Sequence, residues 1–132
     1  VGVTIEAVAA DTTATSEDFD LVVKNMAAGA AAAETFRITS LGSVTVPVTI
    51  TAPGTTGNQT INKAAGRVNI AAAGTTVTVT NSLCSANSIV LATIATNDTT
   101  CTIKNVVPGA GSFVINVVGA NAETAINWLV IS

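Results

Sequence analysis

Short apolar runs divided by turn residues fill the chain from residue 53 to its end, and this pattern constrains the fold more than any other. Each run is rich in β-branched side chains and is bounded by Asn, Asp, Gly or Pro, which is typical of β-strands. The runs are residues 76–80, 89–94, 101–107, 113–118 and 128–131. Because strands at such short intervals favour two packed sheets, we predict an all-β fold with an antiparallel β-sandwich or jelly-roll-like domain.

The first 52 residues carry a strand pattern of their own. Residues 3–7 alternate apolar with polar side chains, a polar turn follows at residues 11–18, and residues 19–23 again place apolar side chains on one face. The densest turn segment, residues 52–58, follows. We therefore expect a β-hairpin extension or stalk in residues 1–52 and a β-sandwich head domain in residues 53–132.

Two segments of this N-terminal part are ambiguous. Residues 27–34 are mostly alanine and could form a short helix, but Gly29 interrupts them and a strand period resumes at Phe36. A hairpin loop is therefore favoured. Residues 44–50 show the clearest alternation in the chain, yet Pro47 removes one backbone donor, which predicts an edge strand or an exposed kink.

The composition predicts that copies of this chain associate. Charged residues make up 10% of the chain, against roughly 25% in ordinary soluble domains. Much of the hydrophobic fraction of 48% is alanine, which buries little area, and aromatic residues make up only 3%. A small core and a sparsely charged surface favour a homo-oligomer. The candidate anchors of the core or of a subunit interface are Phe19, Phe36, Phe113 and Trp128.

The residues that are missing disfavour several functional classes. The chain has no histidine, so a Cys–His nucleophile pair cannot form, and two cysteines alone cannot complete a zinc site. No two carboxylates are placed to act as an acid and a base, so we expect neither an enzyme nor a cofactor. The five basic residues are scattered and the net charge is −3, which disfavours a nucleic-acid partner. The apolar runs are much shorter than the roughly 20 residues of a membrane span.

Two acidic turns are the remaining candidates for cation binding. Glu17, Asp18 and Asp20 lie close together in sequence and could supply oxygen ligands to a hard cation. A solvated turn, with Asp18 and Asp20 pointing away from the core, is favoured instead, and no metal is expected. Asp98 is interpreted as the cap of a hairpin turn.

The two cysteines, Cys84 and Cys101, leave three alternatives open: an intrachain disulfide, an interchain disulfide, or two buried free thiols. An intrachain bridge would stabilise the chain by roughly 3 kcal/mol on the chain-entropy estimate. If residues 89–95 pair with residues 101–107 across the Asp98 turn, however, Cys84 precedes the strand, and direct cross-strand pairing is excluded.

Several strings of the sequence resemble a C-terminal module of tailed-bacteriophage virion proteins, a group that includes tail-fibre, head-fibre and capsid-decoration proteins. These strings are residues 55–63 (TTGNQTINK), 66–70 (GRVNI), 79–83 (VTNSL), 86–93 (ANSIVLAT), 96–100 (TNDTT), 107–113 (VPGAGSF) and 122–131 (AETAINWLVI). Upstream, residues 17–24 (EDFDLVVK) and 33–42 (AETFRITSLG) are similar to a phage fibre segment that precedes the module. Cys84 and Cys101 depart from the family, where an apolar or small residue usually stands.

The resemblance implies an all-β, trimeric virion component without enzymatic residues. The short chain favours a capsid decoration or head-fibre protein on the capsid surface over a tail protein. Its expected partners are two further copies of itself and the major capsid protein or other virion proteins, with residues 1–52 as a stalk or capsid-attachment segment. The alternative is the receptor-binding tip of a tail fibre, which the single tryptophan and the lack of tyrosine disfavour.

Overall fold

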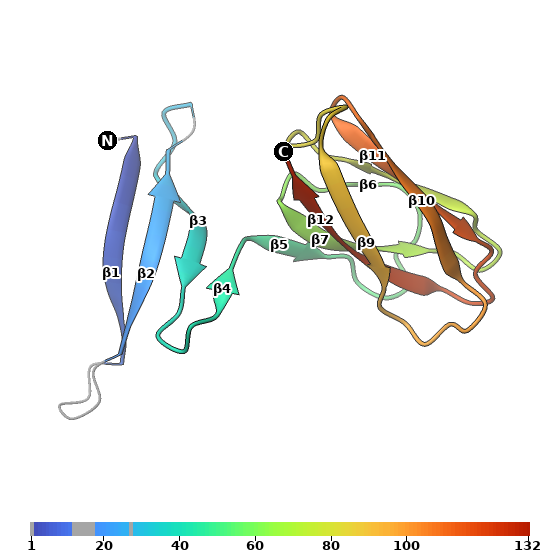
Figure 1. Cartoon of the computed structure of the whole chain (residues 1–132), viewed down its shortest axis with the longest axis horizontal. Helices are drawn as coiled ribbons and strands as arrows, with labels where there is room; N and C mark the ends of the chain where they lie inside the picture. The colour runs from blue at the N-terminus through green and yellow to red at the C-terminus, as the bar shows by residue number, and fades with distance from the viewer. Residues whose placement is uncertain (1, 12–17, 27) are drawn as a thin grey trace. The chain divides into compact units, whose positions relative to one another are not determined.

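The computed structural model describes residues 2–11, 18–26 and 28–132, and within these ranges the chain forms strands and turns but no helix. The chain divides into two compact units, residues Val1–Pro47 and Val48–Ser132 (Figure 1). The second unit is a β-sandwich, which confirms the predicted fold class.

The N-terminal unit is one antiparallel sheet with the strand order β1-β2-β3-β4. Its strands are β1 (Val3–Asp11), β2 (Asp18–Asn25), β3 (Ala33–Ile38) and β4 (Val44–Thr45). The antiparallel pairing of β1 with β2 is that of the expected hairpin, and β3 and β4 widen it into a sheet. The alanine-rich stretch is not helical where it is described: Ala28 and Gly29 have positive φ angles in a turn, and Ala33 begins β3.

Pro47 stands at the division between the two units. The alternating run 44–50, which the sequence presents as one strand, is split into β4 and β5 (Val48–Ile50), and these strands belong to different sheets. Proline has no backbone N–H to donate, so a ladder cannot run through it unbroken. We expected the domain boundary at residue 53, but β5 already pairs with the C-terminal unit, since Val48 is opposite Ala65. The two units therefore divide after Pro47.

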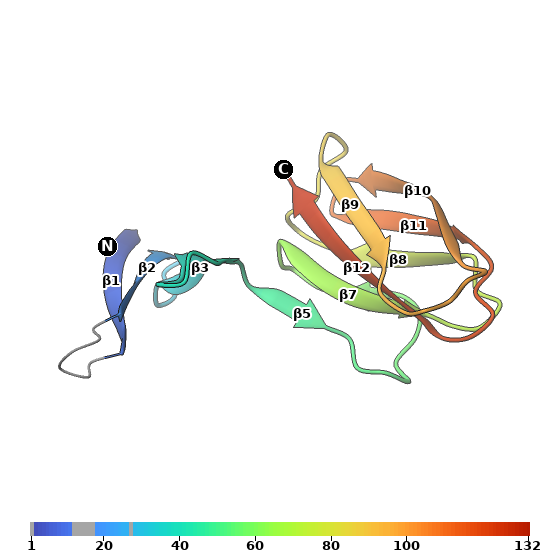
Figure 2. The same ribbon diagram turned by 60° about the horizontal axis from the view of Figure 1, so that its bottom comes forward.

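The C-terminal unit consists of two four-stranded sheets that pack face to face (Figure 2). One sheet has the order β5-β7-β12-β9 and the other β10-β11-β8-β6. The strands after β5 are β6 (Gln59–Thr60), β7 (Ala65–Ile70), β8 (Thr76–Thr80), β9 (Ile89–Ile94), β10 (Thr102–Gly109), β11 (Ser112–Val118) and β12 (Thr124–Ile131). Most pairs are antiparallel, but β5 pairs with β7 and β6 with β8 in parallel.

The pairing of β9 differs from the arrangement considered in the sequence analysis, in which residues 89–95 pair with residues 101–107. Residues 89–94 pair with β12 and not with β10, which pairs with β11 in the other sheet. The loop around Asp98 therefore crosses from one sheet to the other and is not a hairpin turn. Strand β7 was not among the runs singled out from the sequence, because Gly66, Arg67 and Asn69 dilute its apolar pattern.

Alternate side chains of both sheets form the core of the sandwich. Phe113 and Trp128 lie at its centre in edge-to-face contact, with ring centroids 5.1 Å apart and planes inclined by 66°. Such aromatic pairs contribute roughly 0.5–1.5 kcal/mol beyond the area they bury. The other fully buried large apolar side chains of the sandwich are Val68, Ile70, Val77, Val79, Ile115 and Ile126.

Gly66 permits the close approach of β7 to Trp128. The two residues are opposite each other in the β7–β12 ladder. A Cβ atom on Gly66 would lie 2.6 Å from Cζ2 of Trp128 and 2.8 Å from the carbonyl oxygen of Thr49. A backbone oxygen cannot move aside as a flexible side chain can, so only glycine fits here.

We predict that Gly66→Ala lowers the free energy of unfolding by about 1–3 kcal/mol, because the added methyl group overpacks the core. The measurement is urea denaturation followed by the fluorescence of Trp128, the only tryptophan. Gly119→Ala is the control, since nothing lies within 4 Å of its Cβ position. Equal stability losses in the two variants would contradict this account of Gly66.

Candidate interaction surfaces

The two faces of the N-terminal sheet differ in chemistry. Residues opposite each other in a ladder project to the same side. One side, the polar face, carries Glu6, Asp20, Lys24, Glu34 and Arg37. The other side, the apolar face, carries no charged residue; it consists of Val3, Ile5, Ala7 and Ala9 of β1, Phe19, Leu21, Val23 and Asn25 of β2, Ala33, Phe36 and Ile38 of β3, and Val44 of β4.

Ion pairs connect the strands across the polar face. Lys24 Nζ lies 2.7 Å from Glu6 Oε2, and Arg37 binds both Glu34, at 2.6 Å, and Asp20. Asp20 is buried and also accepts a hydrogen bond from the backbone N–H of Ser40. The hydrogen bond from Arg37, with that from Ser40, lowers the pKa of Asp20. Hence Asp20 is not the solvated carboxylate expected from the sequence; it is a structural acceptor.

The apolar face is uncovered within its unit. Ile5 keeps 70% of its side-chain surface exposed, Phe19 56% and Leu21 43%. The one fully buried side chain among the described residues of this unit, Val22, lies on the polar face beneath the ion pairs. A single sheet with one apolar side cannot hide that side without a second layer.

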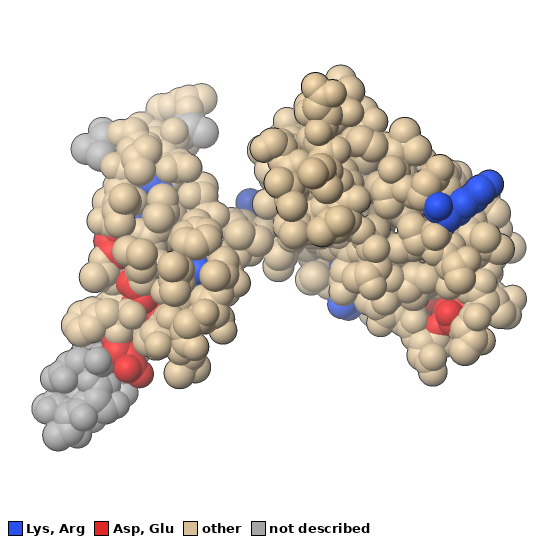
Figure 3. All heavy atoms as spheres, in the orientation of Figure 1, with Lys and Arg blue, Asp and Glu red and all other residues tan. Residues whose placement is uncertain are grey.

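The sandwich has a second, mixed exposed surface on the outside of the sheet β5-β7-β12-β9. Leu91 and Leu129 are opposite each other there, as are Ile89 and Ile131, and all four are exposed. A shallow hollow of about 220 Å³ lies between Leu91 and Leu129. On the C-terminal unit, the charged side chains drawn in Figure 3 stand apart from one another among uncharged ones. Arg67 and Asn127 interrupt this surface, so it is less uniformly apolar than the N-terminal face.

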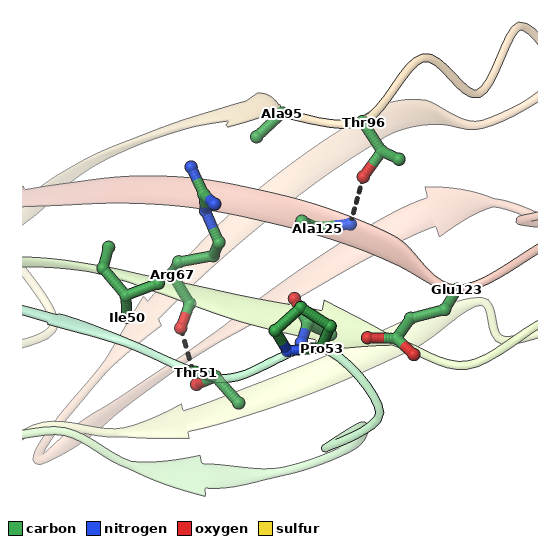
Figure 4. Close-up of a pocket in the computed structure, with 9 residues that line it drawn as sticks. Ile50, Thr51, Pro53, Arg67, Ala95, Thr96, Glu123 and Ala125 are labelled. Carbon is green, nitrogen blue, oxygen red and sulfur yellow. Dashed lines mark hydrogen bonds between the residues drawn. The ribbon is translucent and has the colours of Figure 1, made fainter.

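A pocket of about 330 Å³ lies at one end of the same sheet (Figure 4). Its charged groups are hydrogen-bonded to residues beside the pocket: Arg67 Nε donates to Asn127 Oδ1 at 2.8 Å, and Glu123 accepts from the backbone N–H of Gly54 at 2.9 Å. Thr96 Oγ1 accepts from the N–H of Ala125 at 2.6 Å. The pocket holds one guanidinium and one carboxylate, which could take a small polar ligand but supply no nucleophile with an adjacent base.

Asp98 ties the loop that follows β9 to the loop that precedes β12. Its Oδ1 accepts hydrogen bonds from the N–H and hydroxyl of Thr100, at 2.9 and 2.7 Å, and from the N–H of Cys101 at 3.1 Å. Its Oδ2 accepts from the N–H of Asn121 and the hydroxyl of Thr124. These bonds, above all those from Thr100, hold the pKa of Asp98 well below its usual range. The carboxylate is a cap, as the sequence indicated, but it caps a crossing between sheets.

The two cysteines are buried free thiols. Cys101 immediately precedes β10, while the carbonyl of Cys84 accepts a hydrogen bond from Gly111, just beyond the other end of that strand. At ~3.3 Å per residue the ends of β10 lie roughly 23 Å apart. A disulfide needs Cα atoms within about 7 Å, so an intrachain bridge does not fit this fold. Burial raises the pKa of the Cys101 thiol, which makes it unreactive.

The four candidate anchors fall into two groups. Phe113 and Trp128 are core residues of the sandwich, whereas Phe19 is exposed and Phe36 half-buried on the apolar face. The aliphatic part of that face, with Ile5 and Leu21, was not singled out as a site. The alternation of residues 3–7 and 19–23 places these side chains on one side of a sheet, but it does not show that the unit lacks a second layer.

The described part of the chain offers no other site of recognisable chemistry. Across residues 2–11, 18–26 and 28–132, no group of three or more metal-ligating side chains comes together. Asp18 is exposed, and Glu17 of the acidic turn lies outside the described residues. No helix within the described ranges is long and apolar enough to cross a membrane. Comparison with protein-family models, curated proteins and solved structures finds no match to this chain.

We predict that Asp98→Asn lowers the thermal unfolding midpoint of the sandwich by several degrees at pH 7 and flattens its acid dependence. Because the pKa of Asp98 is lower in the folded chain than in the unfolded chain, its stabilisation is complete above the unfolded-state pKa of about 3.9 and is lost as the pH falls further. Trp128 fluorescence at pH 7 and pH 3 measures this effect.

Glu123→Gln is the matched control, since Asp98 and Glu123 are the only carboxylate side chains in residues 48–132. This variant should keep the acid sensitivity of the parent chain. Identical pH profiles for Asp98→Asn and the parent would refute the role of Asp98 as the cap.

We also predict that a maleimide labels both thiols of urea-unfolded protein. Over the same time it should label neither thiol of the native protein. The reason is burial of Cys84 and Cys101. Labelling is counted by intact mass, and gels with and without reductant should show the same band. A band that only reductant removes would instead establish a disulfide between copies.

Proposed function

We propose that this chain is a structural, non-enzymatic protein of a tailed-bacteriophage virion, namely a homotrimeric capsid decoration or head-fibre protein that stabilises the exterior of the particle. The observation that carries the proposal is the uncovered apolar face of the N-terminal sheet. A chain that exposes Ile5, Phe19 and Leu21 together is built to be covered by other protein. The resemblance of its sequence strings to phage virion modules indicates where that protein would be.

The chemistry of the remaining surface supports the same proposal. The conspicuous polar side chains serve the fold: Asp98 joins two loops, Arg37 bridges strands, and Asn69 donates to the carbonyl oxygens of Ala52 and Thr55. None of these groups is left poised for catalysis. Burial and strand pairing would then be the whole of its chemistry, with the major capsid protein or other virion proteins as partners on the capsid surface.

The alternative is the receptor-binding tip of a tail fibre. The pocket beside Arg67 and Glu123 favours it, because the terminal N–H groups of Arg67 could donate to a host glycan or carboxylate. Exposed aromatic side chains, which usually dominate such recognition, are missing from this pocket. The decoration or head-fibre role is therefore the stronger proposal.

We predict that the native protein has the mass of three chains, about 39 kDa from three times 13.1 kDa, in light scattering. On purified particles, an antibody against the chain should label the heads, with many copies per particle by quantitative mass spectrometry. Label confined to the tail tip, with a handful of copies, would favour the receptor-binding alternative. A protein missing from particles altogether would refute both.

A further inference from the structure

We propose that the apolar face of the N-terminal sheet is the surface through which copies of this chain bind one another. The inference rests on the proposed function, since it names the contact that would join the copies of the homo-oligomer. The sandwich does not need this contact to bury its own core, which is closed by two sheets around Phe113 and Trp128.

The apolar face exposes more than an isolated sheet can sustain. A single layer leaves one side of every strand in water, so its apolar residues gain little from folding alone. Ile5, Phe19 and Leu21 are neighbours across β1 and β2 and form a contiguous patch with Ile38 and Val44. Monomeric soluble proteins rarely expose patches of more than a few hundred Å² of this kind.

The distribution of charge identifies another copy as the occupant. The ion-paired side chains of the sheet, Glu6, Asp20, Lys24, Glu34 and Arg37, lie on the opposite, polar face, where they bind each other. The apolar face therefore offers no charge to a phosphate, a nucleic acid or an acidic or basic protein. An uncharged face is complementary to itself, because packing it against its own copy leaves no carboxylate or ammonium group buried without a partner.

The relief of the face also fits a copy of itself. Ala7 is opposite Leu21 and Ala9 is opposite Phe19, so in this half of the ladder small side chains on β1 lie beside large ones on β2. A sister sheet rotated about a symmetry axis can place its β2 ridge over the β1 depression. Alternation of large and small residues across facing positions is how two sheets interdigitate.

The area is sufficient for a specific interface. With ~4.8 Å between strands and ~3.3 Å per residue, each strand residue covers about 16 Å². Strands β1 to β4 have 9, 8, 6 and 2 residues, so their face covers on the order of 400 Å². Covering it on three copies around a central axis would remove on the order of 1,200 Å² from water, above the roughly 1,000 Å² of a biological interface.

The first test compares Leu21→Asp with Leu41→Asp in the full chain by light scattering across a dilution series. Leu41 is the matched control, because it is 90% exposed in the turn between β3 and β4 and lies outside the apolar face. Leu21→Asp should weaken association by roughly 30-fold or more, since it would bury an unpaired carboxylate. Leu41→Asp should associate as the parent does. The Trp128 fluorescence of both variants reports whether the sandwich stays folded.

The second test keeps the face apolar, so it does not depend on how the sheet tolerates a charge. Ala7→Cys places a thiol on the apolar face, and Thr4→Cys places one on the polar face of the same strand. A short bis-maleimide should link chains through Ala7→Cys and not through Thr4→Cys. The parent chain, with its two buried thiols, sets the background.

The outcomes separate this inference from the proposed function. An oligomer that survives Leu21→Asp, with no preferential linking through Ala7→Cys, overturns the inference and leaves a homotrimer joined elsewhere. A parent chain that is monomeric in solution overturns the inference and the homotrimer, while antibody label on phage heads would still support a decoration protein. Selective cross-linking through Ala7→Cys and selective dissociation by Leu21→Asp together establish the apolar face as the interface between copies.

Discussion

Burial of apolar sheet faces governs both units of this chain, and the two units meet that requirement differently. In the C-terminal unit, two sheets close over the edge-to-face pair of Phe113 and Trp128, and Gly66 lets β7 approach the indole ring. The N-terminal unit has only one layer, so the side that carries Ile5, Phe19 and Leu21 has no covering sheet within it. The hydrophobic effect drives the C-terminal unit to fold on itself, and in our proposal it drives the N-terminal unit to bind a second copy.

Polar side chains reinforce this division. On the N-terminal sheet, the strand register places Arg37, Asp20 and Glu34 on one face, where they form ion pairs, and places Ile5, Phe19 and Leu21 on the other. In the sandwich, Asp98 serves as the acceptor that ties together two loops, each of which connects one sheet to the other. In both places the ionised group stabilises local structure.

Much of the fold could be predicted from alternation alone. The runs at residues 76–80, 89–94 and 113–118 are all strands, because β-branched side chains with a period of two specify both conformation and buried face. Alternation does not specify which strand lies beside which, so the pairing of β9 with β12 was not foreseen. Pro47 was recognised as a disruption, but a sequence cannot tell a kink from a passage between sheets.

The candidate surfaces were less predictable for a related reason. Asp20 looks solvated in the sequence because its partner, Arg37, lies on another strand, 17 residues away. To predict the apolar face, one must know that the N-terminal unit has no second layer to cover its sheet, which only the topology reveals.

The central claim is that other copies of the chain cover the apolar face, and carbene footprinting of the unmodified protein tests it directly. Phe19 and Leu21 should label far less than Leu41; labelling in proportion to their exposure in the single chain, 56% and 43% against 90%, would contradict it.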